Sequence, residues 1–251
     1  MKWSWNVGKI AGVDLKIHLT FFLLIGWIGF STLLNGGTVG AVLIEVLFIS
    51  ALFLCVVLHE FGHALAARRF GIATRDITLL PIGGVARLET MPEDPKEELI
   101  VAAAGPLVNV LIGVILFVGL LISGTFIRPF DLTMLTENFW LRLMTVNISL
   151  VVFNLIPAFP MDGGRVLRSI LATRMEYLKA TRAAAFIGRG LALLMGIAGF
   201  FLNPLLILTG IFIWYGAGSE AQTVELKRGL KGLVVRDAMI SQFYMAEANQ
   251  S

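Results

Sequence analysis

The sequence predicts an all-α polytopic membrane protein of about six transmembrane helices, with a short extended segment between the second and third spans. Of its 251 residues, 57% are hydrophobic and 15% are charged, and the mean hydropathy is +0.84. A soluble domain carries about 25% charged residues, so this composition excludes an ordinary soluble protein. Six apolar runs are the candidate spans: Ile17–Leu34, Ala41–Ala67, Leu99–Gly124, Phe139–Ile156, Ile187–Leu202 and Pro204–Tyr215.

The number of spans depends on the first run and the last two runs. Ile17–Leu34 is long for the apolar core of a secretory signal and lacks a clear small-residue cleavage site, so it predicts a retained span. The last two runs are short and are separated only by Asn203 and Pro204, which favours a tight helical hairpin. A count of four or five full spans with shorter inserted pieces therefore stays open.

Lysine and arginine residues gather in alternate connecting segments and so predict the orientation. They precede the first run, separate the second from the third, follow the fourth and occupy the tail, whereas the intervening segments are poor in them. By the positive-inside rule, both termini face the cytoplasm. The net charge of +3 thus reflects topology, and no nucleic-acid partner is expected.

The segment Ile77–Glu89 lies between the second and third runs and differs from both in composition. Its β-branched residues, central Pro81 and glycine pair predict extended chain with a bend rather than helix. The acidic residues Glu93 and Asp94 that follow suit the start of the next helix, because carboxylates are favourable at a helix N-terminus.

His59, Glu60 and His63 form an H-E-x-x-H motif near the end of the second run. On a helix, positions four apart lie about 40° apart around the axis and about 6 Å apart along it, so both imidazoles can reach one metal ion. Glu60 is then close enough to act as a general base on water. In a soluble helix the motif indicates an ordinary metalloprotease; within an apolar run it indicates an intramembrane site, nearer the cytoplasmic face.

A catalytic zinc usually takes three protein ligands. The chain contains three histidines in all, so the third ligand is either His18 or a group other than histidine. Asp162 lies in a segment with two prolines and two glycines at the cytoplasmic end of the fourth run. Irregular backbone at membrane depth is tolerated only where protein buries it or water lines it. We therefore expect Asp162 as the third ligand, with His18 as the alternative.

Taken together, the motifs resemble those of the site-2 protease family of intramembrane zinc metalloproteases. The matching stretches, within residues 10–215, are 59–63 (HEFGH), 81–85 (PIGGV), 104–109 (AGPLVN) and 154–163 (NLIPAFPMDG). The resemblance implies one catalytic Zn²⁺ held by His59, His63 and Asp162, with Glu60 as general base. It also implies hydrolysis of a peptide bond in or near a transmembrane segment of a membrane-anchored protein, which is regulated intramembrane proteolysis.

Two further roles are hypotheses. Asn154 could stabilise the oxyanion of the transition state, or it could form a helix–helix hydrogen bond. A substrate helix has no free backbone groups until it unwinds. The extended segment Leu80–Leu88, with Gly83, Gly84 and Val85 at its centre, could then pair with the unwound substrate as an added strand.

The expected domains are a membrane-embedded metalloprotease domain over residues 1–215 and a polar cytoplasmic tail over 216–251. In the resembling subgroup, two regulatory domains of the cystathionine-β-synthase type often follow the last span, and Leu233–Ile240 looks like the opening of one. The resemblance implies a multi-pass protein of a prokaryotic cytoplasmic membrane. Its expected partners are the lipid bilayer and a transmembrane protein substrate, and a homo-oligomer stays open.

Two other classes of function remain. One is a membrane metal-binding or transport protein in which Glu60 performs no hydrolysis. Transport predicts polar and ionisable positions along a path through the bilayer, whereas this chain concentrates them on the cytoplasmic half. The other is an inactive relative that binds transmembrane helices without cutting them.

Overall fold

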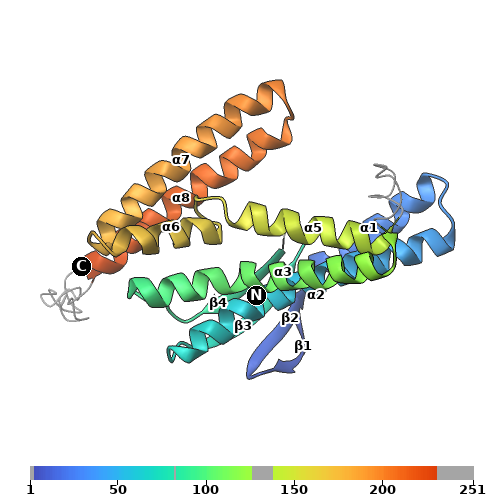
Figure 1. Cartoon of the computed structure of the whole chain (residues 1–251), viewed down its shortest axis with the longest axis horizontal. Helices are drawn as coiled ribbons and strands as arrows, with labels where there is room; N and C mark the ends of the chain where they lie inside the picture. The colour runs from blue at the N-terminus through green and yellow to red at the C-terminus, as the bar shows by residue number, and fades with distance from the viewer. Residues whose placement is uncertain (1–2, 82, 126–137, 231–251) are drawn as a thin grey trace, which may run out of the picture.

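A computed structural model describes residues 3–81, 83–125 and 138–230 (Figure 1). In chain order, the elements of this part are β1 (Ser4–Ile10), β2 (Val13–His18), α1 (Leu19–Leu34), α2 (Val39–Arg69), β3 (Thr74–Leu80), β4 (Gly83–Leu88), α3 (Pro95–Ile122), α5 (Phe139–Asn154), α6 (Asp162–Ala172), α7 (Tyr177–Phe201) and α8 (Leu205–Leu230). The prediction of a mainly helical chain with an extended segment before the third long helix is therefore confirmed.

Three helices of the described part are long and apolar enough to cross a membrane: α2, α3 and α7. Helices α1 and α5 are apolar but shorter, so length and composition do not confirm six spans. The helices that contain the last two apolar runs extend beyond these runs. Helix α7 begins at Tyr177 and α8 continues to Leu230, because the two helices pack along each other as a hairpin well beyond their apolar parts (Figure 1).

The four strands form one sheet in the order β1-β2-β3-β4. Strands β1 and β2 are a hairpin whose turn residues Ala11 and Gly12 have φ of 51° and 88°, the left-handed pair that a two-residue hairpin favours. Strand β2 then pairs in parallel with β3, and α1 and α2 make the crossover between them. Strand β4 pairs antiparallel with β3 and forms an edge of the sheet.

The sheet was only half predicted, because two of its strands come from the N-terminus. Strand β1 is largely exposed, and an irregularity between Asn6 and Gly8 interrupts the alternation of apolar and polar residues that marks a strand. Its partner β2 does alternate strictly between apolar and polar residues, but its last two residues were assigned to the first apolar run, so the signal was missed. Only the segment that became β3 and β4 was therefore predicted as extended.

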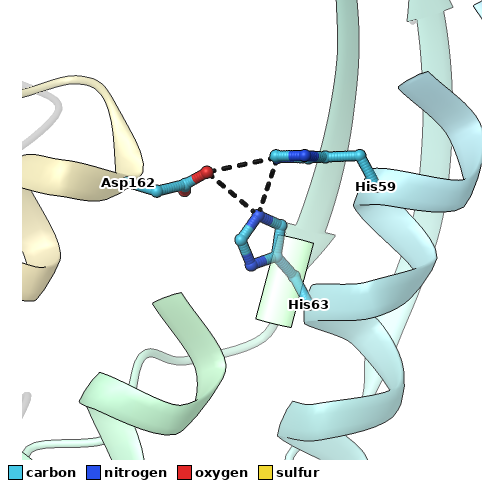
Figure 2. A group of neighbouring side chains, drawn as sticks. All are labelled: His59, His63 and Asp162. Carbon is cyan, nitrogen blue, oxygen red and sulfur yellow. Dashed lines mark hydrogen bonds and ion pairs between the residues drawn. The ribbon is translucent and has the colours of Figure 1, made fainter. Parts of the chain in front are cut away.

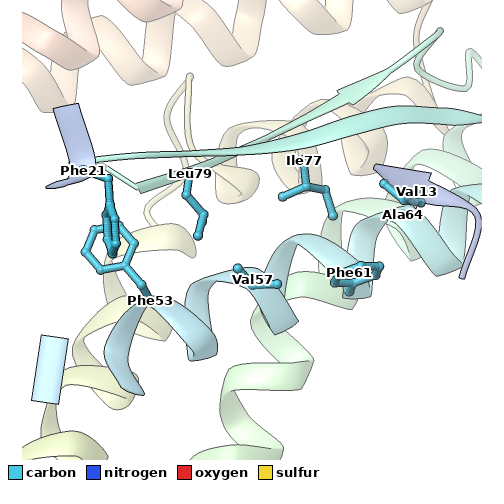
Figure 3. Packing of buried hydrophobic residues seen from close by; sticks show 8 residues of the cluster. All are labelled: Val13, Phe21, Phe53, Val57, Phe61, Ala64, Ile77 and Leu79. Atoms are coloured by element: carbon cyan, nitrogen blue, oxygen red, sulfur yellow. The ribbon is translucent and has the colours of Figure 1, made fainter. Parts of the chain in front are cut away.

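One stripe of α2 packs against this sheet (Figure 3). Phe53, Val57 and Phe61 recur at four-residue spacing and therefore share a helix face, which meets Ile77 and Leu79 of β3. Burying this stripe fixes the rotation of α2 about its own axis. His59 and His63 are consequently directed to α3 and α6, and Glu60 to β4, as the contacts described next establish.

Candidate metal centre

Three buried side chains from two distant parts of the chain converge at one point (Figure 2). His59 Nε2 lies 3.1 Å from His63 Nε2 and 3.1 Å from Asp162 Oδ2. His63 Nε2 lies 3.2 Å from the same carboxylate oxygen. The structure thus brings together the two histidines of α2 and the expected third ligand at the start of α6.

The donor set fits zinc. Tetrahedral zinc with bonds of about 2.0–2.1 Å holds its donor atoms about 3.3 Å apart, close to the separations found here. Two imidazole nitrogens and one carboxylate oxygen are also the donors of a common catalytic zinc site, which keeps a fourth position for water or substrate. Among the described residues, this is the one group of three or more His, Cys, Asp or Glu side chains whose donor atoms converge in this way.

The tautomer of His63 also fits a zinc ligand. Its Nδ1 lies 2.7 Å from the backbone carbonyl oxygen of Val101 on α3. A carbonyl can only accept, so Nδ1 carries the proton and Nε2 presents its lone pair to the metal position. His59 Nδ1 has no hydrogen-bond partner within the described residues. Helix α3 therefore orients one of the two imidazoles.

Gly105 of α3 lies directly against both imidazoles. A Cβ at this position would stand 2.6 Å from His63 Cε1 and 2.7 Å from His59 Nε2, much closer than carbon and nitrogen atoms can pack. The Ala-Gly-Pro stretch at 104–106 thus provides more than close helix packing, because the missing side chain leaves room for the ligands.

Asp162 is held in place by the loop that precedes it. Loop residues Ala158 and Phe159 are fully buried, packed against α7 and α8. A Cβ on Gly163 would lie 2.5 Å from the backbone carbon of Leu155, and one on Gly164 would lie 2.5 Å from the nitrogen of Phe159. The two glycines therefore let the loop fold back onto the first turn of α6. The expected irregular segment ends at Asp162, which begins a short helix rather than lying within a loop.

Glu60 lies beside this centre and is not one of its ligands. The backbone N–H of Ala86 on β4 donates to Glu60 Oε2 at 3.2 Å, and a Cβ on Gly84 would lie 2.8 Å from Glu60 Cγ. The carboxylate is therefore held between the edge strand and the metal ligands on its own helix. This position suits a general base, which must stay close to the reacting atoms without coordinating the metal.

The remaining predicted residues lie as follows. His18 caps α1, and its Nδ1 lies 2.7 Å from Thr20 Oγ1, so it is not part of the metal group. Asn154 is the last residue of α5, and its side chain forms no hydrogen bond within the described part of the chain. Gly83, Gly84 and Val85 begin the edge strand β4, and Val85 is 42% exposed.

One feature beside the site was missed. Arg168, expected only to set topology, is fully buried and pairs with Glu98 of α3 and Glu220 of α8. Glu98 and Glu220 are 70 and 52 positions away in sequence, so no local pattern predicts the contacts. The residues 233–240, expected to open a regulatory domain, lie outside the described residues.

Comparison with known proteins gives a consistent result. Residues 47–197 match the profile of peptidase family M50. A zinc metalloprotease of Methanocaldococcus jannaschii is 40% identical over 240 residues, which are 95% of this chain and 67% of that protein. A protein of Synechocystis sp. named for the same activity is 34% identical over 253 residues, covering 94% of this chain and 64% of its own length. The chain thus spans about two thirds of these curated relatives.

A solved structure also matches. The site-2 protease from Methanocaldococcus jannaschii superposes with a TM-score of 0.60 at 38% sequence identity. The match covers 87% of this chain and 95% of that chain. The similarity therefore extends over most of the chain, not only over the sequence motifs.

Proposed function

Because the chain belongs to peptidase family M50, the site-2 type of zinc metalloprotease, we propose that its function is to hydrolyse peptide bonds in or near the transmembrane segments of membrane-anchored protein substrates. The observation that carries this proposal is that Asp162 of α6 meets His59 and His63 of apolar helix α2. Glu60 lies beside them on the same helix α2. Zinc bound by the three ligands would act as a Lewis acid towards the scissile carbonyl and towards water.

The chain's own residues supply the proton transfer and the substrate orientation. Glu60 takes a proton from the attacking water and delivers it to the departing amide nitrogen. The Ala86 N–H bond keeps the carboxylate of Glu60 turned to β4. An unwound substrate strand lying along the free edge of β4 would run past Glu60, and Gly83, Gly84 and Val85 would pair with it. Asn154, one loop before Asp162, is the proposed donor to the oxyanion.

The proposed topology has α1, α2, α3, α5, α7 and α8 as six spans and both termini in the cytoplasm of a prokaryote. Helix α2 then runs inward, and Arg68 and Arg69 at its last turn lie on the cytoplasmic side. Residues 1–215 form the membrane-embedded domain and 216–251 the cytoplasmic tail, with α8 crossing the boundary between them.

The first experiment measures zinc per chain and cleavage of a membrane-anchored substrate in detergent-solubilised protein. Wild type should hold about one zinc per chain, Asp162→Ala should lose it, and Glu60→Gln should keep it while cleavage falls by at least about 10²-fold. Glu45→Gln is the matched control, because Glu45 pairs with Arg142 at 2.6 Å, away from the metal centre. Zinc retained without Asp162 would reject that ligand, and full cleavage by Glu60→Gln would favour another mechanism.

A further inference from the structure

The side chain of Arg168 links three helices at the base of the α7–α8 hairpin. It is 0% exposed. Its Nε donates to Glu98 Oε1 of α3 at 2.8 Å, and Nη2 donates to the same oxygen. Its Nη1 donates to Glu220 Oε1 of α8 at 2.7 Å. The guanidinium also stands 5.0 Å from the ring centre of Phe159, in the loop before Asp162.

These contacts lie on the helices that build the metal centre. Arg168 follows Asp162 by six residues on α6, about 9 Å along the helix axis. Glu98 precedes Val101 by less than one turn of α3, and Val101 is the carbonyl that orients His63. Helix α3 thus contacts both halves of the centre: the histidines through Val101 and Gly105, and the helix of Asp162 through Glu98.

A role in membrane topology alone does not require this arrangement. An arginine sets orientation equally well when its head lies in water. Burying the ion pair costs desolvation energy, and apolar replacements of such pairs are often as stable. What the planar guanidinium adds is fixed geometry, because it holds two partners in set directions at once. The pair therefore fits a role in alignment better than one in stability.

We propose that Arg168 is a positioning residue for the zinc site: by binding Glu98 and Glu220 together, it holds α6 at the separation from α3 at which Asp162 meets His59 and His63, and it couples α8 to that ligand. The inference rests on the metalloprotease function proposed above. It adds that a displacement of the cytoplasmic end of α8 moves Asp162 relative to the two histidines, because Arg168 links α8 to α6.

The test uses Co²⁺ alone as the probe in the full chain, because the visible absorption of bound Co²⁺ reports its ligand geometry. Affinity for Co²⁺ and the shape of the absorption band are measured for wild type, Arg168→Met, Arg168→Lys and Glu220→Gln. Loss of a group bonded directly to a metal ligand weakens binding by about 10–100-fold, and Arg168 acts one step further out, so a loss near the low end, about tenfold, is expected. We expect that loss and an altered band in Arg168→Met, and smaller changes of the same kind in the other two.

Control variants distinguish a wrong proposal from a variant that does not fold and from a wrong metal site. Arg182→Gln removes a chemically similar pair, Arg182 with Glu225, that joins α7 to α8 without touching α6, so it should bind Co²⁺ as wild type does. Arg168→Lys keeps the charge opposite Glu98 and guards against a variant that fails to fold. Wild-type affinity and band shape in both Arg168→Lys and Glu220→Gln would overturn the proposal. If Asp162→Ala also binds Co²⁺ normally, the proposed metal site itself is wrong.

A cleavage assay of the same variants provides a second test, because it measures kcat and KM separately. A displaced metal ligand lowers kcat, whereas KM stays near its wild-type value if Arg168 makes no contact with the substrate. A rise in KM at unchanged kcat would instead place Arg168 in substrate binding and would contradict the positioning role.

Discussion

The backbone of Gly105 lies against the imidazole of His63, and a Cβ there would stand 2.6 Å from its Cε1. Alanine at this position must displace an imidazole from the metal centre or push α3 away from α2. We expect Gly105→Ala to lose most of its zinc and to cleave substrate at least about tenfold more slowly, the effect of disturbing a ligand's surroundings. Zinc analysis of purified protein measures the first effect directly.

Gly119 provides the control on the same helix. A Cβ at Gly119 would meet no atom within 4 Å, so Gly119→Ala changes helix propensity alone. That change favours the helix by about 1 kcal/mol. Its zinc content should equal that of wild type. Equal zinc in both alanine variants would show that the ligands tolerate a side chain from α3.

The metal centre was largely predictable because its motifs are local. His59, Glu60 and His63 lie within five residues of one helix, and the helical repeat alone places both imidazoles on one side. Asp162 was marked by prolines and glycines around a lone carboxylate in apolar sequence. Its pairing with the histidines, 103 positions away from His59, then followed from counting the available ligands.

The contacts that support the metal centre could not be predicted, because no local sequence motif marks them. The Val101 carbonyl that orients His63 is a backbone group, and every residue has one. Arg168 looks like any other basic residue in the segment after the fourth apolar run, and only the packing of α3, α6 and α8 reveals that it is buried. Strand β2 pairs with β3 across a crossover of two helices, so its role in the sheet depends on tertiary structure.

Asn154→Ala tests the proposed oxyanion donor. Removing one such donor costs about 10²–10³-fold in kcat, and the loss should leave KM and zinc content near their wild-type values. The side chain forms no hydrogen bond within the described residues, so truncation breaks no helix–helix contact there. A fall in thermal stability with unchanged kcat would assign Asn154 a structural role instead.

The carboxylate of Asp76 links three strands of the sheet through contacts that depend on pH. Its carboxylate accepts from Lys16 Nζ at 2.8 Å and lies 3.6 Å from Arg87 Nε, so it joins β2, β3 and β4. Burial raises the pKa of Asp76, but the Lys16 hydrogen bond and the Arg87 charge outweigh burial and hold it below the usual 3.8. A carboxyl group with a lowered folded-state pKa stabilises the fold above its unfolded pKa and loses that contribution as the pH falls through the folded value.

Asp76→Asn should therefore lower the free energy of unfolding at neutral pH by about 1.5–3 kcal/mol, the range for a hydrogen bond to a charged group. The difference from wild type should shrink in acid, below pH 3.8. Thermal unfolding of the detergent-solubilised protein at both pH values measures it. Glu89→Gln, at an exposed position just after β4, should change neither curve. A difference that persists in acid would mean that the amide disturbs packing rather than charge.

Val85→Pro tests whether β4 is the template for an unwound substrate. Proline has no N–H and fixes φ, so it interrupts strand pairing at this position. Val85 pairs with Thr78 of β3, so proline also weakens the β3–β4 pair, and zinc content checks that the metal ligands on α2 and α6 stay in place. We expect cleavage to fall at least about tenfold through a higher KM, with zinc unchanged. Val85→Thr keeps a β-branched residue with its N–H and should cleave as wild type does. Equal activity of the proline variant would reject strand addition at β4 and would require the substrate to reach Glu60 from another side.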